Sequence, residues 1–76
     1  MLDLAHLGPA LRRLRQVRDL RQHELAEAAG VTKSMVSAYE RGRRRPSLPT
    51  LVQLLNAVGA DFAVLRRAFR EARRSR

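Results

Sequence analysis

Residues 22–41 constrain the fold more than any other stretch, because two short helical patterns follow one another there with almost no chain between them. The first pattern stops at Gly30, a residue that readily takes the left-handed conformation that ends a helix. The second follows Thr32, whose side chain can cap a helix. Helices joined by so short a turn cross at close range, which requires a small residue such as Ala26 at the crossing. The other apolar positions are expected to point into a shared core: Leu25, Val31, Val36 and Tyr39.

Apolar residues recur at helical spacing on both sides of this pair. Before it, the apolar face consists of Leu7, Leu11, Leu14 and Val17. After it, Ser47 can cap a helix that ends before Gly59 and carries Leu48, Leu51, Leu54, Leu55 and Val58. Asp61 can cap a last helix with a seam of Phe62, Leu65, Phe69 and Ala72. No stretch alternates as a strand does, so the sequence predicts an all-α fold of five helices, over residues 9–18, 22–28, 33–41, 48–58 and 61–75.

Length and composition indicate one small domain without bound groups. The 76 residues are expected to form a single domain, 1–76, in which residues 1–7 form an arm, an extra turn or part of a dimer contact. The sequence has no Cys, and His6 and His23 stand far apart, so no metal or cofactor is expected. No apolar run reaches the ~20 residues of a membrane span, and Asp3 stands where a signal peptide carries Lys or Arg. The expected compartment is therefore the cytoplasm.

The charge balance indicates an acidic partner. The chain holds 16 Lys and Arg against 7 Asp and Glu, a net charge of +9. Nucleic acid is the first candidate, and an anionic membrane surface is the second. The membrane is disfavoured because the amphipathic last helix has no Trp to anchor it and because the two-helix pattern would have no role there.

Several short motifs together resemble one known family. The chain resembles the helix-turn-helix domains of the Cro and phage-repressor family, also called the XRE family, from about Leu7 to Leu65. The resemblance rests on Leu7-Gly8, Leu11-Arg12-Arg13-Leu14-Arg15, Gln22-His23-Glu24-Leu25-Ala26, Gly30-Val31-Thr32, Tyr39-Glu40-Arg41-Gly42 and Arg45-Pro46-Ser47. It implies a repressor-like fold, a bacterial or phage-encoded source, and entry of the helix at residues 33–41 into the major groove of DNA.

The resemblance also implies two sets of DNA contacts. The base-facing positions are Lys33, Ser34, Ser37 and Ala38: the Lys suits guanine, the Ser hydroxyls suit several base edges, and the Ala methyl suits thymine. The phosphate-contacting positions are Gln22, Thr32, Arg41, Arg43 and Arg44. One departure from the family pattern is Arg21, which stands where a capping Ser or Thr is usual and removes a cap worth ~1 kcal/mol.

Two structural contacts complete the expected site. Arg15 and Glu40 match a family ion pair that links the first helix to the end of the recognition helix and orients it. Since residues beyond position 65 exceed what one small core needs, the last helix, within residues 61–75, is expected to supply a two-fold dimer contact through Phe62, Leu65 and Phe69.

These observations predict a sequence-specific, double-stranded DNA-binding regulator of transcription, a homodimeric repressor of a nearby promoter with a pseudo-palindromic operator. The alternative is an antitoxin of the same fold whose main task is to bind a protein toxin. No enzyme activity is expected, because Ser34, Ser37 and Ser47 have no nearby His or Lys that would form a catalytic pair.

Overall fold

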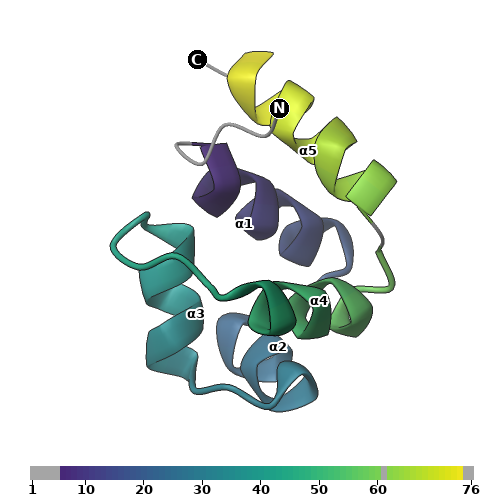
Figure 1. Cartoon of the computed structure of the whole chain (residues 1–76). Coiled ribbons are helices and arrows are strands. Elements are labelled where there is room, and N and C mark those ends of the chain that lie inside the picture. The colour runs from purple at the N-terminus through teal and green to yellow at the C-terminus, as the bar shows by residue number, and fades with distance from the viewer. Residues whose placement is uncertain (1–5, 61, 75–76) are drawn as a thin grey trace.

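The computed structural model describes residues 6–60 and 62–74, except the side chains of Phe62, Phe69, Arg73 and Arg74. Figure 1 shows its five helices: α1 (Leu7–Val17), α2 (Gln22–Ala29), α3 (Lys33–Glu40), α4 (Leu48–Ala57) and α5 (Phe62–Arg74). Within these ranges there is no strand, so the predicted all-α fold of five helices is confirmed. None of the described helices is long and apolar enough to cross a membrane.

The start of α1 differs from the prediction. The helix begins at Leu7 rather than at Pro9, because a proline in the first turn occupies a position whose backbone N–H would have no partner inside the helix. Leu7 is buried in the core, so it is not part of an N-terminal arm. Residues 1–5 of that expected arm, and the expected cap Asp61, lie outside the described residues.

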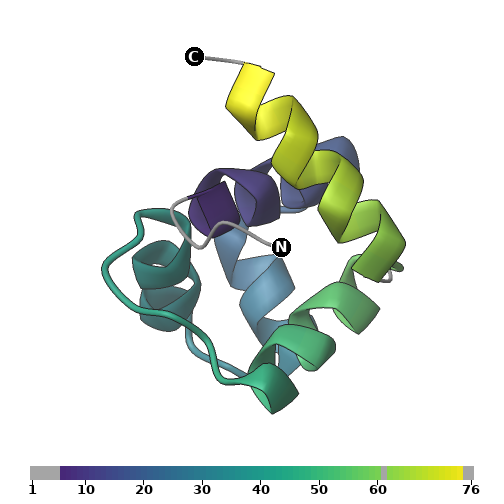
Figure 2. The same cartoon turned by 45° about the horizontal axis from the view of Figure 1, so that its top comes forward.

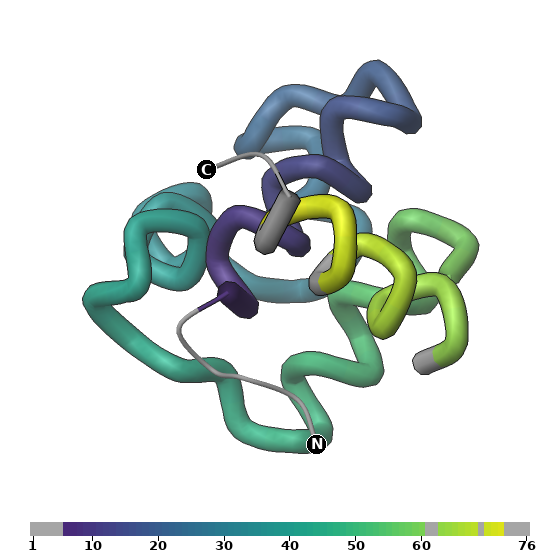
Figure 3. The backbone as a smooth tube through the Cα atoms, turned by 90° about the horizontal axis from the view of Figure 1, so that it is seen from above, coloured from purple at the N-terminus to yellow at the C-terminus, as the bar shows by residue number. Residues whose placement is uncertain are grey.

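α1 lies at the centre of the arrangement, in contact with both α3 and α5, while α2 contacts α3 and α4. In Figures 1 and 2, α5 runs along α1 on the side away from α3. Figure 3, viewed from above, shows α5 lying over α1 with α3 at the edge of the molecule. One face of α3 is therefore packed, and its other face is open.

The core lies among all five helices, and its largest fully buried side chains are Leu25, Val36, Leu54, Leu55 and Leu65. Two predictions for the apolar faces are wrong. Val17 is 72% exposed and Leu48 is 65% exposed. Both are terminal residues of their helices, where helical spacing gives the correct direction but the described part of the neighbouring helices leaves most of the side chain uncovered.

The cap of α4 gives a first test of local stability. The Ser47 hydroxyl oxygen accepts a hydrogen bond from the backbone N–H of Thr50 at 3.3 Å. We expect Ser47→Ala to lower the free energy of unfolding by about 1 kcal/mol, because that N–H loses its acceptor. Urea unfolding followed by circular dichroism measures the change, and Ser47→Asp, which retains a capping oxygen, is the control. Equal losses for both variants would contradict a capping role.

Candidate nucleic-acid interface

An open groove of about 410 Å³ runs along the outer face of α3. All four predicted base-facing residues line it, together with three of the predicted phosphate-contacting residues: Gln22, Lys33, Ser34, Ser37, Ala38, Arg41 and Arg43. Lys33 and Ser34 are exposed, whereas Ser37 and Ala38 are half-buried. The groove thus offers ammonium, hydroxyl, amide and guanidinium donors on one surface, which suits an acceptor-rich and anionic ligand.

The turn between α2 and α3 fixes how α3 presents this surface. Gly30 has a φ of +72°, a conformation that costs glycine little and other residues more. The backbone N–H of Val31 bonds to the carbonyl of Ala26 at 3.0 Å, and the Thr32 hydroxyl accepts a bond from the backbone N–H of Met35 at 3.1 Å. Because Val36 is buried on the inner face of α3, the groove residues face outward.

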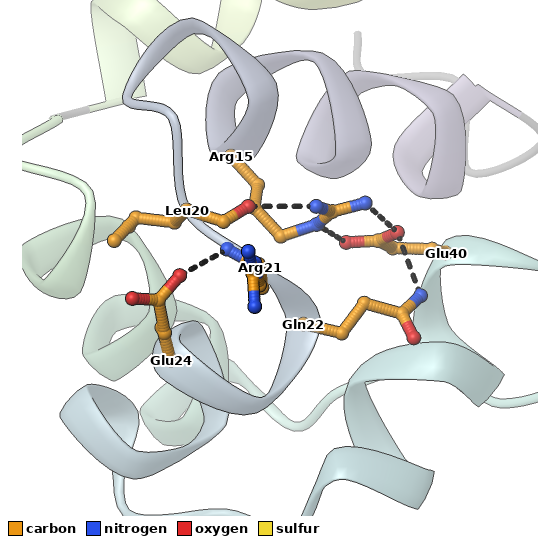
Figure 4. Close-up of polar contacts among 6 residues, drawn as sticks. All are labelled: Arg15, Leu20, Arg21, Gln22, Glu24 and Glu40. Atoms are coloured by element: carbon orange, nitrogen blue, oxygen red, sulfur yellow. Dashed lines mark hydrogen bonds and ion pairs between the residues drawn. The ribbon is translucent and has the colours of Figure 1, made fainter.

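A two-bond ion pair ties α1 to the end of α3 (Figure 4). The Arg15 guanidinium donates from Nε to Oε2 of Glu40 at 2.7 Å and from Nη2 to Oε1 at 3.0 Å. A third bond runs from Nη1 to the carbonyl oxygen of Leu20 at 2.7 Å. The two side chains are only 12% and 4% exposed, and the hydrogen bond to Glu40 raises the pKa of Arg15 above its usual value. The pair thus joins α1, the connection before α2, and α3.

Gln22 belongs to the same network, a contact that the sequence analysis missed. Its Nε2 donates to Oε1 of Glu40 at 3.1 Å (Figure 4). An amide nitrogen carries two hydrogens, so one N–H of Gln22 remains for another acceptor. No local pattern links two residues so far apart in the sequence, which is why only the folded chain reveals this bond.

The start of α2 is capped although the usual capping side chain is missing. Arg21 has no acceptor on its side chain, but its backbone N–H bonds to Oε1 of Glu24 at 2.7 Å. Glu24 therefore supplies its half of a capping box, and α2 retains part of the stabilisation that the sequence analysis expected it to lose.

Two predicted phosphate-contacting residues do not line the groove. Thr32 instead caps α3. Arg44 lines a separate recess between the start of α1 and the loop after α3, together with Leu7, Gly8, Tyr39, Gly42, Arg43 and Arg45. At its edge, α1 meets the last turn of α3 closely: a Cβ on Gly8 would lie 2.5 Å from the backbone oxygen of Glu40 and 2.8 Å from that of Tyr39.

The expected dimer contact needs one correction. Leu65 has no exposed surface, because it packs inside the core where α5 covers α1, so it is not a contact residue. The side chains of Phe62 and Phe69 lie outside the described part of the structure. On the surface, α5 is linked to α1 by an ion pair between Arg13 and Glu71 at 2.5 Å, with both side chains about half exposed.

A second recess, of about 200 Å³, opens on the α1 side of the groove. Its lining combines the ion-pair network with two further arginines: Arg12, Arg15, Gln22, Glu40 and Arg41. Arg12 is not among the residues that the sequence predicts to contact DNA. Its position three residues before Arg15 on a helix was the available signal, since such residues share a face.

Comparisons with known proteins agree with this geometry. A family model described as a helix-turn-helix domain matches residues 6–69. The ImmF control region 10 kDa protein of Bacillus phage phi105 is 35% identical over 66 residues, which are 87% of this chain and 73% of the phage protein. The transcriptional repressor RstR of cryptic phage CTXphi, from Vibrio cholerae, is 42% identical over 55 residues, which are 72% of this chain and 50% of RstR. The crystal structure of the restriction-modification controller protein C.AhdI from Aeromonas hydrophila superposes with a TM-score of 0.78 and 35% identity, over 86% of this chain and 98% of C.AhdI.

Proposed function

The chain belongs to the helix-turn-helix domain family, and on that premise we propose that it is a sequence-specific, double-stranded DNA-binding regulator that represses transcription from a nearby promoter. The observation that carries the proposal is the groove along α3, which gathers all four base-facing residues on one open surface. RstR is a transcriptional repressor and C.AhdI a controller protein of restriction and modification, and both support a regulatory role.

In this proposal α3 enters the major groove, with its exposed N-terminal residues toward the base edges. Lys33 donates to guanine O6 or N7, while the hydroxyls of Ser34 and Ser37 donate to or accept from several bases. The cationic residues that line the groove of the protein, together with the free amide N–H of Gln22, bind backbone phosphates of the DNA. Thr32 and Arg44 do not line this groove, and each contacts a backbone phosphate at the edge of the interface. These phosphate contacts release counterions, so affinity falls steeply as salt rises.

The proposed active form is a homodimer on a pseudo-palindromic operator. The recognition helix α3 has only eight residues, and a short helix reads few base pairs. Two copies of α3 related by a two-fold axis double the reading length, with half-sites about one helical turn apart. We assign the contact between the copies to α5, with Phe62 and Phe69 as its apolar side chains.

The residues of the groove are given binding roles rather than catalytic ones. Its described lining contains no His, Asp or Glu next to Ser34 and Ser37, and within the described residues no hydrogen bond joins the Lys33 amine to either hydroxyl, so neither serine is paired with a general base there. Ser47 is engaged as a helix cap and donates its hydroxyl to Oγ1 of Thr50 at 3.0 Å. Binding without chemistry is the role that this arrangement supports.

The test is selection from a random DNA duplex library, run with the wild type and with a variant combining Lys33→Ala, Ser34→Ala and Ser37→Ala. We expect the wild type to enrich a palindrome, and we expect the variant to lose that selectivity while it retains weak, salt-sensitive binding, because its phosphate contacts remain. A control variant replaces three exposed residues outside the groove, with the changes Gln16→Ala, Gln53→Ala and Asn56→Ala.

Each result of the selection has a clear meaning. Enrichment of the same palindrome by the wild type and the control, but not by the groove variant, supports base reading by α3. Equal retention of all sequences by all three proteins would contradict sequence-specific regulation, and would direct the search to a protein partner such as a toxin.

A further inference from the structure

The second recess, which contains the Arg15–Glu40 pair in its lining, is continuous with the groove along α3. Gln22 and Arg41 line both hollows, so a ligand that fills the groove passes the mouth of the recess. Arg12, an exposed residue of α1, also lines this recess. A helix that lies outside the two-helix unit thus contributes a cation to the edge of the candidate interface.

The charges inside this recess are unevenly matched. Its single carboxylate, that of Glu40, accepts hydrogen bonds from Arg15 and Gln22 and is only 4% exposed. Arg12 and Arg41 are both exposed residues. Within the described residues, no hydrogen bond or ion pair involves either of these two side chains. The recess therefore holds two cations that no internal anion neutralises, a configuration that attracts an anion.

We propose that this recess binds a backbone phosphate of double-stranded DNA, held between the guanidinium groups of Arg12 and Arg41, an inference that rests on the proposed function. A phosphate has acceptor oxygens on several sides, and arginine offers planar pairs of N–H donors that match them. Gln22 adds a third donor, because its amide has one N–H left after the bond to Glu40. The Arg15–Glu40 pair forms the floor and contributes no net charge.

This phosphate contact fixes where α1 lies on the duplex, and it reads no base. Contacts to the backbone position a protein and carry no direct sequence information. Loss of Arg12 should therefore weaken binding to matched and mismatched duplexes by the same factor. That uniform loss separates its role from the roles of Lys33 and Ser34 on α3, whose removal changes the preference among sequences.

The experiment compares Arg12→Gln with Arg18→Gln, which removes the same charge from an exposed position at the C-terminal end of α1, outside both hollows. Affinity for the duplex selected by the wild type is measured across a range of salt concentrations. For Arg12→Gln we expect the slope of log affinity against log salt to become shallower by about 1.8, that is about 0.9 for each of the two copies in the dimer, so that its deficit is roughly tenfold larger at 50 mM than at 200 mM salt. Arg18→Gln should leave the slope unchanged, and Arg12→Lys, which retains the charge, should restore the wild-type slope.

The outcomes distinguish this inference from the proposed function. If the wild type binds DNA, equal effects of Arg12→Gln and Arg18→Gln on the salt slope would overturn the phosphate site and leave the proposed regulatory function intact. A change by Arg12→Gln in the ratio between matched and mismatched duplexes would also overturn it, because a phosphate contact reads no base. Failure of the wild type to bind any duplex would instead remove the proposed function on which the inference rests.

Discussion

Replacement of Gly8 by alanine should lower the free energy of unfolding by about 3 kcal/mol, although alanine normally stabilises a helix by about 1 kcal/mol relative to glycine. The added Cβ would lie 2.5 Å from the backbone oxygen of Glu40 and 2.8 Å from that of Tyr39. Both neighbours are backbone atoms of α3, so no side chain can rotate to make room, and α1 must move away from α3. Urea unfolding followed by circular dichroism measures the loss.

Gln16→Ala is the matched control for this change. It also introduces alanine into α1, but at an exposed position, and it should leave the free energy of unfolding almost unchanged. A Gly8→Ala variant as stable as the control would show that α1 and α3 are not in close contact at this point.

The second large effect is expected for Glu40→Gln, which should cost about 3 kcal/mol of unfolding free energy. The neutral amide leaves the nearly buried guanidinium of Arg15 without its counter-charge, and its NH₂ group faces donors from Arg15 and Gln22 where an oxygen stood before. Thermal and urea unfolding measure the loss. Because the hydrogen bond to Glu40 raises the pKa of Arg15 above its usual value, the guanidinium remains charged throughout the neutral range, and the cost should be constant across neutral pH.

Arg13→Gln provides the comparison for an exposed pair. Arg13 and Glu71 also form an ion pair between two helices, but their side chains are 46% and 42% exposed. Solvent screens such a pair, so the substitution should cost less than 1 kcal/mol. Similar losses for Glu40→Gln and Arg13→Gln would contradict the argument that burial makes the Arg15–Glu40 pair important.

Helical periodicity, caps and glycines were sufficient to predict the five helices, because these signals are local. Gly30 and Thr32 mark the turn between α2 and α3 where the structure has it. The errors lie where tertiary contacts decide. Val17 and Leu48 have the spacing of core residues, but both are mostly exposed among the described residues. Leu65 was assigned to a dimer contact, but it is buried in the core, since the sequence does not tell how much of α5 lies against α1.

The candidate site was predictable to the extent that its residues belong to one helix. Lys33 and Ser37 share a face of α3 by spacing alone, and the family resemblance gave that face a role. The bond between Gln22 and Glu40, and the place of Arg12 beside them, depend on how three helices meet. Such contacts between distant parts of the chain leave no periodic signal in a single sequence.

The separation between the two faces of α3 has a consequence for how this protein can evolve. Val36 and Tyr39 are buried and pack α3 against the core, whereas Lys33 and Ser34 are exposed on the other side of the helix. Residues at the exposed positions can therefore be exchanged at little cost to folding. A gene duplicate could acquire a new target sequence through two or three substitutions there, while the scaffold that presents them stays the same.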